Sequence, residues 1–359
     1  MTVMKPIFMK QNLVAIAFWL MTGLCSSTTA LAQWRADALV PETGKDYAVV
    51  AFSANLMREE PAFEAEMGDQ ALMGTVVEIL DRKGSWVQIR TGEPYTAWVT
   101  ELGLAPMDAE ALKAYLAAPK WICTAAVTRV YDAPPAGRNP GAILCELVAG
   151  NLVRAVQASR SRKGYTPVLL PDGRTGWVCA KEVAPFDAWA SAYGASRTVT
   201  GPTDEGILST ARRFLGVPYM WGGTSIKNVD CSGLTRSTFF LNGILLPRNA
   251  SQQAHCGIPV EPADGPRFWE SLQPGDLVFW GREATADKPA KATHVGIYIG
   301  DSRFIHASHV VRINSFDREQ PDFYDRKPLC FKRILGQQDL PGTGILSVKN
   351  SPYYVLLSK

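Results

Sequence analysis

The stretch "WGGTSIKNVDCSGLTRS", Trp221 to Ser237, places one cysteine, Cys231, between an aspartate and a Ser-Gly pair. Asn228 or Asp230 can cap a helix that begins about at this cysteine. The unpaired N–H groups and the positive end of the helix dipole then lie near the sulfur, which predicts a lowered thiol pKa. Such a cysteine is a core residue, a disulfide partner or a nucleophile, and the rest of the chain has to decide which.

A nucleophilic thiol needs a base, normally a histidine that a third group orients. The chain has four histidines, His255, His294, His306 and His309. Those at 294 and 306 lie on consecutive predicted strands, "THVGIYIG" (293–300) and "RFIHAS" (303–308), whereas we expect the other two at the surface. The two strand histidines are therefore the candidates for the base and its orienting partner.

The loop between these two strands decides whether the two imidazoles can meet. If Gly300-Asp301-Ser302 forms a three-residue loop, Gly296 lies opposite His306. His294 then falls on the same face of the sheet, on a diagonal of roughly 7–8 Å between Cα atoms. A two-residue loop would instead put the two rings on opposite faces.

The order of the elements around these motifs predicts a fold class. A helix is expected in "EGILSTARRFLG" (205–216), and a second one from the cysteine to about Gly243. Strands follow at 274–280, 293–300, 303–308 and 329–335. Helices followed by strands with short turns predict an α+β domain with an antiparallel sheet over residues 201–337. The segment 338–359 is a tail without a predicted structure.

Two runs of short strands, 47–107 and 123–178, precede this domain. Each ends in a Gly-containing turn and an aromatic-Val pair, "AWV" at 97–99 and "GWV" at 176–178. This degenerate repeat predicts two small β-barrels, one at 33–109 and one at 110–200 that starts with a short helical connector. A single larger β-sandwich is the alternative.

The N-terminal residues 1–32 have the features of a secretory signal peptide. Two early lysines precede an apolar run from Leu13 to Leu24, and "ALA" at 30–32 is a small-x-small cleavage site. The run is too short to span a bilayer, and no stable membrane span is expected. A lipid anchor at Cys25 is the alternative, although Leu24 is bulky for a lipobox. We expect export to the periplasm or the cell surface.

Charge and cysteine usage limit the partners of the chain. The 359 residues have a net charge of +3, which falls to +1 when the two signal lysines are removed, so a nucleic-acid partner is not expected. Six cysteines remain after cleavage: Cys123, Cys145, Cys179, Cys231, Cys256 and Cys330. The chain has no CxxC pair or histidine-rich cluster, so we expect no metal site and no cofactor. The sequence does not decide whether Cys145 and Cys179 form a disulfide.

Several ordered motifs between about residues 203 and 336 resemble the NlpC/P60 cysteine peptidases. They are "GVPYMWGGTSIKNVDCSGLT" (216–235), "LPRNASQQ" (246–253), "LQPGDLVFW" (272–280), "THVGIYIGD" (293–301) and "FIHAS" (304–308). Bacterial SH3-like barrels before such a domain are typical of the γ-D-glutamyl-L-diamino-acid endopeptidases, the dipeptidyl-peptidase VI subgroup. "NLMREEPAFEAEMGDQALMG" (55–74) resembles the first barrel of that subgroup. The resemblance implies a papain-like α+β domain behind two SH3-like barrels.

The resemblance also implies roles for the residues of the site. Cys231 would be the nucleophile, His294 the base and His306 the residue that orients the base. Tyr219 would lie beside an oxyanion hole to which the N–H of Cys231 contributes, a kind of contact that is worth on the order of 10²–10³ in rate.

Four further residues are implied to bind the substrate. Asp230 and Ser232 would hold its D-glutamyl and amino-terminal groups. An acid and a tyrosine of the first barrel would recognise the free amine of L-Ala, and the matching positions are Glu66 and Tyr95. This chain has Asn249-Ala250 where close relatives have Asp-Ser, which removes a carboxylate and a hydroxyl there. The polar loop 281–289 can shape the pocket for the diamino acid.

The implied reaction is hydrolysis of the bond between γ-D-Glu and an L-diamino acid, L-Lys or meso-diaminopimelate. The substrates would be murein stem peptides with a free N-terminal L-Ala. One alternative is a murein hydrolase that acts on intact or cross-linked peptidoglycan. Another is a non-catalytic cell-wall-binding protein, which the complete set of one thiol and two imidazoles disfavours.

Overall fold

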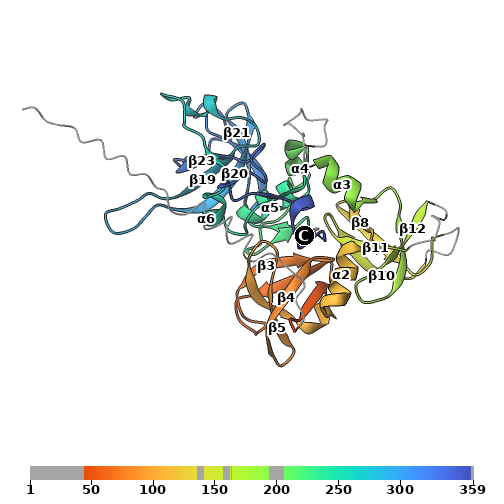
Figure 1. Cartoon of the computed structure of the whole chain (residues 1–359). Coiled ribbons are helices and arrows are strands. Elements are labelled where there is room, and N and C mark those ends of the chain that lie inside the picture. The colour runs from red at the N-terminus through yellow and green to blue at the C-terminus, as the bar shows by residue number, and fades with distance from the viewer. Residues whose placement is uncertain (1–43, 136–140, 157–161, 163, 194–205, 357–359) are drawn as a thin grey trace, which may run out of the picture.

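The computed structural model describes residues 44–135, 141–156, 162, 164–193 and 206–356. These residues form three lobes, two made of strands and one made of helices and strands (Figure 1). The predicted signal segment 1–32, with Cys25, lies outside the described residues, so the signal peptide and the lipid anchor stay predictions.

The first lobe is a sheet of seven strands in the order β3-β2-β6-β5-β4-β1-β7. Its strands are β1 (Tyr47–Val50), β2 (Ala54–Arg58), β3 (Met67–Leu72), β4 (Val76–Lys83), β5 (Trp86–Arg90), β6 (Thr96–Thr100) and β7 (Leu104–Met107), with a 3-10 turn η1 (Glu101–Gly103). Val87, Ile89, Ala97 and Val99 lie in its apolar core, whereas the alternate residues Gln88, Arg90, Thr96 and Thr100 are partly or fully exposed. The period-2 pattern in these segments predicted the strands correctly.

The second lobe repeats the first. Its strands are β8 (Lys120–Cys123), β9 (Val127–Tyr131), β10 (Ile143–Val148), β11 (Leu152–Ala155), β12 (Tyr165–Leu169), β13 (Thr175–Cys179) and β14 (Val183–Pro185). The order β10-β9-β13-β12-β11-β8-β14 is the order of the first sheet, counted from its own first strand. Each lobe also has its own buried apolar cluster. The predicted repeat is therefore confirmed, and the single β-sandwich is wrong.

Two helices flank the barrels: α2 (Ala109–Ala117) packs against β1 and β7 of the first lobe, and α3 (Phe186–Tyr193) packs against β8 and β14 of the second. The connector α2 is capped by Asp108, whose carboxylate accepts from the N–H of Ala111 at 2.8 Å. Helix α3 directly follows β14 in the chain. The connector predicted from the sequence is thus a real helix, and it begins where its cap stands.

The third lobe is an α+β domain. Its helices are α4 (Ile207–Arg212), α5 (Cys231–Phe240) and α6 (Ala250–Gln253), with 3-10 turns η2 (Phe268–Ser271) and η3 (Val348–Asn350). The main sheet is antiparallel with the order β18-β23-β19-β20-β21-β22. Its strands are β18 (Ile258–Pro259), β19 (Leu277–Arg282), β20 (Lys291–Gly300), β21 (Arg303–Ser308), β22 (Val310–Ser315) and β23 (Cys330–Arg333). Two short pairs, β15 (Thr224–Ser225) with β16 (Asn228–Val229) and β17 (Ile244–Leu245) with β24 (Leu346–Ser347), complete it.

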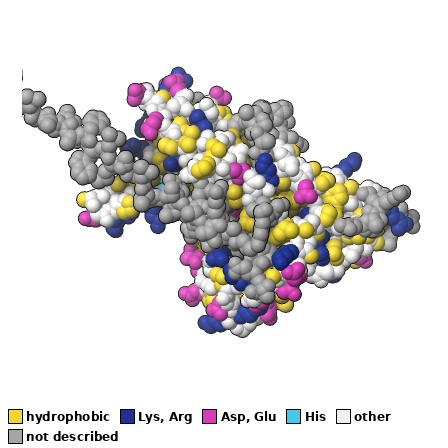
Figure 2. Space-filling model, viewed as in Figure 1, with side chains coloured by type: hydrophobic (Ala, Val, Ile, Leu, Met, Phe, Trp, Pro, Cys, Tyr) yellow, Lys and Arg dark blue, Asp and Glu magenta, His cyan; other side chains and the backbone are white. Residues whose placement is uncertain are grey.

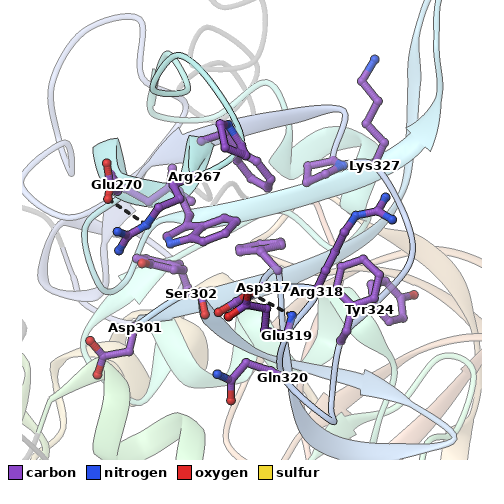
Figure 3. A pocket seen from close by; sticks show the side chains of 18 of the residues that line it. Arg267, Glu270, Asp301, Ser302, Asp317, Arg318, Glu319, Gln320, Tyr324 and Lys327 are labelled. Carbon is purple, nitrogen blue, oxygen red and sulfur yellow. Dashed lines mark hydrogen bonds and ion pairs between the residues drawn. The ribbon is translucent and has the colours of Figure 1, made fainter.

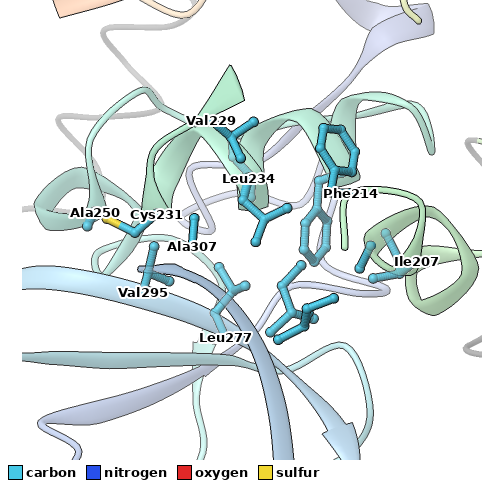
Figure 4. Packing of buried hydrophobic residues seen from close by; sticks show 14 of the residues in the cluster. Ile207, Phe214, Val229, Cys231, Leu234, Ala250, Leu277, Val295 and Ala307 are labelled. Carbon is cyan, nitrogen blue, oxygen red and sulfur yellow. The ribbon is translucent and has the colours of Figure 1, made fainter. Parts of the chain in front are cut away.

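Both faces of this sheet are apolar, and they bury different elements. Helix α5 covers one face, where Leu234 packs with Val295, Leu277 and Ala307 (Figure 4). A second cluster covers the opposite face; its largest members are Trp269, Trp280, Phe304 and Phe316. The predicted α+β class is confirmed, and the sheet separates two environments for the site.

The described part of the C-terminal tail, up to residue 356, packs against both the first barrel and the α+β domain. Its strand β24 pairs with β17 of the α+β domain. The ring of Tyr354 packs 5.6 Å from that of Phe240, and a Cβ at Gly92 of the first barrel would lie 2.6 Å from the Tyr353 ring. The tail, for which the sequence predicted no structure, therefore joins the first barrel to the α+β domain.

The surface and the cysteines add two observations. Acidic and basic side chains are interspersed on the face shown in Figure 2. No helix within the described ranges is long and apolar enough to cross a membrane. The six cysteines in the described part of the chain are free thiols, and no disulfide joins Cys145 on β10 to Cys179 on β13, since β9 lies between these two strands.

Candidate active site

The helix that carries the cysteine begins at Cys231, as its cap predicts. The Asp230 carboxylate accepts from the N–H of Gly233 at 2.7 Å and from the N–H of Gly222 at 3.0 Å. A Cβ at Gly233 would lie 1.9 Å from the carbonyl oxygen of Gly223. Glycines at positions 222, 223 and 233 are therefore needed for the loop before β15 to pack against the start of α5.

The sulfur of Cys231 lies between the helix start and strand β20. The backbone N–H groups of Ser232 and Val295 donate to it. The cysteine belongs to the apolar cluster beneath α5, together with Ala250 and Val295 (Figure 4). Alanine at position 250 thus contributes apolar packing next to the sulfur rather than a polar contact.

The β20–β21 hairpin has the register that the two histidines require. Gly296 pairs with His306, as predicted. The predicted three-residue loop is wrong in detail, because Gly300 pairs with Arg303 across a two-residue turn at Asp301-Ser302. A register shift between Tyr298 and Gly300 supplies the extra residue, as a β-bulge does, and restores the same-face arrangement.

The two imidazoles form one hydrogen-bonded unit. Nε2 of His294 lies 2.7 Å from Nδ1 of His306, and Nε2 of His306 lies 2.9 Å from Oδ1 of Asn314 on β22. The rings of Trp280 and Tyr324 pack against His306 at centroid distances of 6.2 and 5.0 Å. His306 is fully buried, so its orientation is fixed by packing as well as by hydrogen bonds.

The sulfur and the imidazoles approach strand β20 from different sides. His294 lies on the face of Trp280, whereas Val295 lies on the face that α5 covers. The pairing of β20 with β21 begins at Gly296, and Val295 directs its N–H to the sulfur of Cys231 instead. The sulfur thus meets the edge of the strand next to the residue that carries the imidazole.

Burial decides the charge of these groups in the free protein. It raises the pKa of Cys231 to about 11, and the Asp230 carboxylate adds to this rise, against the opposing effects of the Val295 and Ser232 N–H groups. Burial also lowers the pKa of His294 to about 3 and that of His306 to about 4. The predicted lowering of the thiol pKa is wrong, because desolvation outweighs the helix terminus.

Tyr219 lies beside the cysteine. Its backbone N–H donates to the carbonyl of His309, just past the end of β21. Burial raises the pKa of its hydroxyl to about 12, with further increases from Cys231 and Asp230. The hydroxyl is therefore a neutral donor at the pH of the cell. His255 and His309 are exposed, as predicted.

Asp230 and Ser232 are buried and engaged by the protein itself. Arg248 donates to the Asp230 carboxylate at 2.5 and 3.2 Å and to the Ser232 hydroxyl at 3.0 Å. The Ser232 hydroxyl also lies 3.2 Å from the Asp230 carboxylate. Their contact with a substrate stays a prediction, and their observed role is to position the start of α5.

The first barrel supplies charges to this buried network. Asp69 lies 2.9 Å from Nε of Arg248, as an ion pair without hydrogen-bond alignment, and accepts from Arg236 at 2.9 Å. Arg236 also donates to Glu93 at 2.9 Å, and the Tyr354 hydroxyl of the tail donates to Glu93 at 3.2 Å. The network joins the barrel and the tail to the helix of the cysteine.

The tyrosine of the first barrel, Tyr95, contacts an acid that was not among the predicted site residues. The Tyr95 hydroxyl donates to Oε1 of Glu59 at 2.5 Å, whereas the Glu66 side chain is exposed. Gly68 makes room for this pair, because a Cβ there would lie 2.0 Å from the Tyr95 hydroxyl. Burial and the Glu59 contact raise the Tyr95 pKa above its ordinary value. Contact of Glu66 and Tyr95 with a substrate amine stays a prediction, and the acid that Tyr95 contacts in the structure is Glu59.

The sequence analysis missed four residues that the structure brings to the site: Glu59, Asp69, Arg248 and Asn314. Glu59 and Asp69 lie in the motif at 55–74, but that motif contains several acids and no pattern says which ones face the α+β domain. Asn314 lies on β22, a strand that was not predicted. The alternation in "VVRINS" (310–315) is the signal that could have revealed it.

A large hollow of about 1100 Å³ lies on the Trp269 side of the sheet (Figure 3). Its floor is aromatic and its rim carries charges of both signs, among them the Arg267–Glu270 pair. It contains neither Cys231 nor the two strand histidines, and it borders the site only through residues such as Tyr324. The chemistry of the thiol therefore takes place outside this hollow.

A thiol at a helix start and, on the neighbouring strands, two imidazoles that share one hydrogen bond are the components of a nucleophile, a base and an orienting group. Together with the antiparallel α+β domain, they define the class of the cysteine peptidases.

The chain belongs to the NlpC/P60 family of cysteine peptidases. The model of the NlpC/P60 family matches residues 216–326, and that of the bacterial dipeptidyl-peptidase SH3 domain matches residues 57–104. A gamma-D-glutamyl-L-lysine dipeptidyl-peptidase of Bacillus cereus is 30% identical over 251 residues, which are 68% of this chain and 68% of the relative. Dipeptidyl-peptidase 6 of Lysinibacillus sphaericus is 27% identical over 76% of this chain and 92% of its own.

The fold has a counterpart among solved structures. A crystal structure of an NlpC/P60 family protein from Bacillus cereus matches 80% of this chain and 99% of that chain, with a TM-score of 0.61 at 23% identity. The match extends over the barrels as well as the α+β domain, because the α+β domain alone is much shorter than 80% of the chain.

Proposed function

We propose that Cys231 attacks the peptide carbonyl, that His294 takes the thiol proton, and that His306 holds His294 in place. The observation that carries this proposal is the 2.7 Å contact between the imidazoles, on the strand whose Val295 donates to the sulfur. A neutral thiol next to a neutral imidazole suits general-base activation during the attack.

The steps balance with these three groups and one water molecule. The S–C bond forms as the thiol proton moves to His294, and the C–N bond breaks as His294 returns that proton to the leaving amine. Water then hydrolyses the thioester with His294 again as the base. The N–H of Cys231 and the hydroxyl of Tyr219 are the donors that we assign to the oxyanion.

The proposed substrate is a murein stem peptide with a free N-terminal L-Ala, cut between γ-D-Glu and the L-diamino acid. The relatives named gamma-D-glutamyl-L-lysine dipeptidyl-peptidase and dipeptidyl-peptidase 6 support this substrate class. The exposed Glu59–Tyr95 pair supports recognition of an ammonium group, since a carboxylate can bind it directly. The protein would act after export, in the periplasm or at the cell surface.

The direct test is incubation of the pure protein with L-Ala-γ-D-Glu-L-Lys. Release of L-Ala-γ-D-Glu, followed by mass spectrometry, is the expected result. An intact tripeptide after prolonged incubation would refute the proposed function. Intact sacculi as a second substrate separate this proposal from a hydrolase of cross-linked peptidoglycan, which would cut them at least as fast.

We expect Glu59→Gln to raise KM by about 10- to 100-fold with kcat nearly unchanged, since a charged hydrogen bond is worth about 1.5–3 kcal/mol. Steady-state kinetics on L-Ala-γ-D-Glu-L-Lys measures this. Glu66→Gln is the matched control and should leave KM unchanged. With the N-acetylated tripeptide, wild type and Glu59→Gln should be equally poor. A larger effect at Glu66 than at Glu59 would contradict this assignment.

We expect the acid limb of the kcat/KM profile to lie well below pH 6.5. The base works only when neutral, and burial holds the pKa of His294 at about 3 and that of His306 at about 4. Below about pH 6.5 these histidines bind protons in the unfolded chain but not yet in the folded protein. The free energy of unfolding therefore falls as the pH is lowered from about 6.5 towards the pKa values of the folded state. Rates should therefore be measured with circular dichroism at each pH, so that loss of fold is recognised.

The control for this profile is His309→Asn. His309 is exposed and has a φ of 63°, which asparagine tolerates, so its removal should not change the profile. An acid limb centred at pH 6.5 or above, with the fold intact, would show that the buried histidines are not the groups that limit the reaction.

A further inference from the structure

A polar chain crosses three neighbouring strands on the Trp280 face of the sheet. It runs from His294 on β20 through His306 on β21 to Asn314 on β22, with contacts of 2.7 and 2.9 Å. It ends at the backbone carbonyl of Asp322, which accepts from Nδ2 of Asn314 at 2.7 Å. Both inner members are buried, His306 completely and Asn314 to 9% exposure. Water therefore offers them no alternative partner.

The carbonyl at the end of the chain fixes the orientation of the amide. A backbone carbonyl can only accept a hydrogen bond, so the atom of Asn314 that faces Asp322 must be the NH₂ group. The other atom, Oδ1, then faces His306, and an amide oxygen also only accepts. Nε2 of His306 must therefore carry a proton and donate it.

The same reasoning continues to His294. Both imidazoles are neutral, since burial lowers the pKa of each. A neutral His306 with its proton on Nε2 has a bare Nδ1, which can only accept. Nε2 of His294 must then be the donor in the 2.7 Å contact. That leaves Nδ1 of His294 without a proton, and Nδ1 is the nitrogen that can take one from a thiol.

We propose that Asn314 is a positioning residue of the active site, whose amide sets the tautomers of both histidines so that Nδ1 of His294 is the free base. This inference rests on the proposed role of His294. When His294 becomes an imidazolium, its positive charge faces the bare Nδ1 of His306 and, through that ring, the Asn314 oxygen. The amide thus supports the charged state as well as the tautomer.

The tautomers can be read directly by NMR. In protein with ¹⁵N-labelled histidine, the nitrogen shifts separate protonated from bare ring nitrogens. We expect Nε2 protonated and Nδ1 bare in both His294 and His306. The signals are assigned by their loss in the variants His294→Gln and His306→Gln. In Asn314→Leu, we expect His306 to lose this single state. A proton on Nδ1 of His306 in the wild-type protein would overturn the proposal.

Kinetics of two variants separates positioning from packing. Asn314→Leu removes the acceptor and should lower kcat between about 10²- and 10⁴-fold with little change in KM, as a wrong tautomer does in a triad. Asn314→Asp keeps an acceptor for Nε2 of His306 and should recover at least about tenfold of that loss. Burial of a carboxylate costs more folding free energy than burial of leucine. If the role of Asn314 were purely structural, the Asp variant would therefore be less stable and less active than the Leu variant.

The outcomes for the inference and for the proposed function are distinct. The tautomers are measured without substrate, so expected tautomers in a protein that does not cut L-Ala-γ-D-Glu-L-Lys would refute only the proposed reaction. Hydrolysis by a protein in which Asn314→Leu keeps the wild-type kcat would refute only the role of Asn314. Thermal unfolding of each variant shows whether a lost rate reflects a lost fold.

Discussion

Replacement of Cys231 by alanine is expected to lower kcat on L-Ala-γ-D-Glu-L-Lys by on the order of 10⁵-fold or more, down to the background of substrate binding and oxyanion contacts. The reason is chemical, since no other group at the site can form the acyl intermediate. The variant should fold normally, because alanine fits the apolar cluster in which the thiol is buried. Release of L-Ala-γ-D-Glu by mass spectrometry and a circular dichroism spectrum check both expectations.

The matched control is Cys145→Ala, which removes a half-buried thiol from the second barrel. Its kcat should equal that of the wild type. Appreciable turnover by Cys231→Ala, or an equal loss in Cys145→Ala, would remove Cys231 from the role of nucleophile. The kcat of His294→Gln should be as low as that of Cys231→Ala, since the thiol and the base act as one unit.

Replacement of Arg248 by methionine is expected to lower the free energy of unfolding by about 3–5 kcal/mol. Arg248 is 2% exposed and lies between Asp69 of the first barrel and Asp230, the cap of α5. Without the guanidinium, two buried carboxylates have lost their shared cation. Asp230 also loses a partner that holds it under the helix of Cys231, so activity should fall together with stability.

Denaturant unfolding, followed by tryptophan fluorescence and by activity, measures this loss. Lys327→Met is the control, because Lys327 pairs with Glu283 on the surface, at side-chain exposures of 83% and 66%. Exposed pairs contribute about 0–1 kcal/mol. An Arg248→Met protein as stable as Lys327→Met would show that the buried network does not hold the barrel to the domain.

Several elements of the fold follow from patterns a few residues long. The start of α5 is one, since the Asp230 carboxylate reaches the N–H three residues ahead. The strands of both barrels are another, and their repetition in the sequence predicted the shared strand order. The face shared by His294 and His306 also followed from alternation. The turn that achieves it did not, because a bulge and a three-residue loop shift the register equally.

The residues that surround the site were harder to predict. Glu59 and Glu66 stand in the same motif, and only the approach of Tyr95 over Gly68 distinguishes them. Asn314 reaches His306 through a strand whose pattern is short. The predicted direction of the shift in the thiol pKa was wrong, because a helix terminus can be recognised in a sequence, whereas the depth of burial at Cys231 cannot.

The sequence by itself determined the chemical components, namely one capped thiol, two histidines on adjoining strands, and a duplicated barrel. These features depend on residues within one helix turn or one hairpin, where the separation in the sequence sets the distance in space. Only the tertiary structure decided which charges surround the thiol. The contacts of that network join positions up to 261 residues apart, and their burial arises only when the barrel and the tail close on the domain.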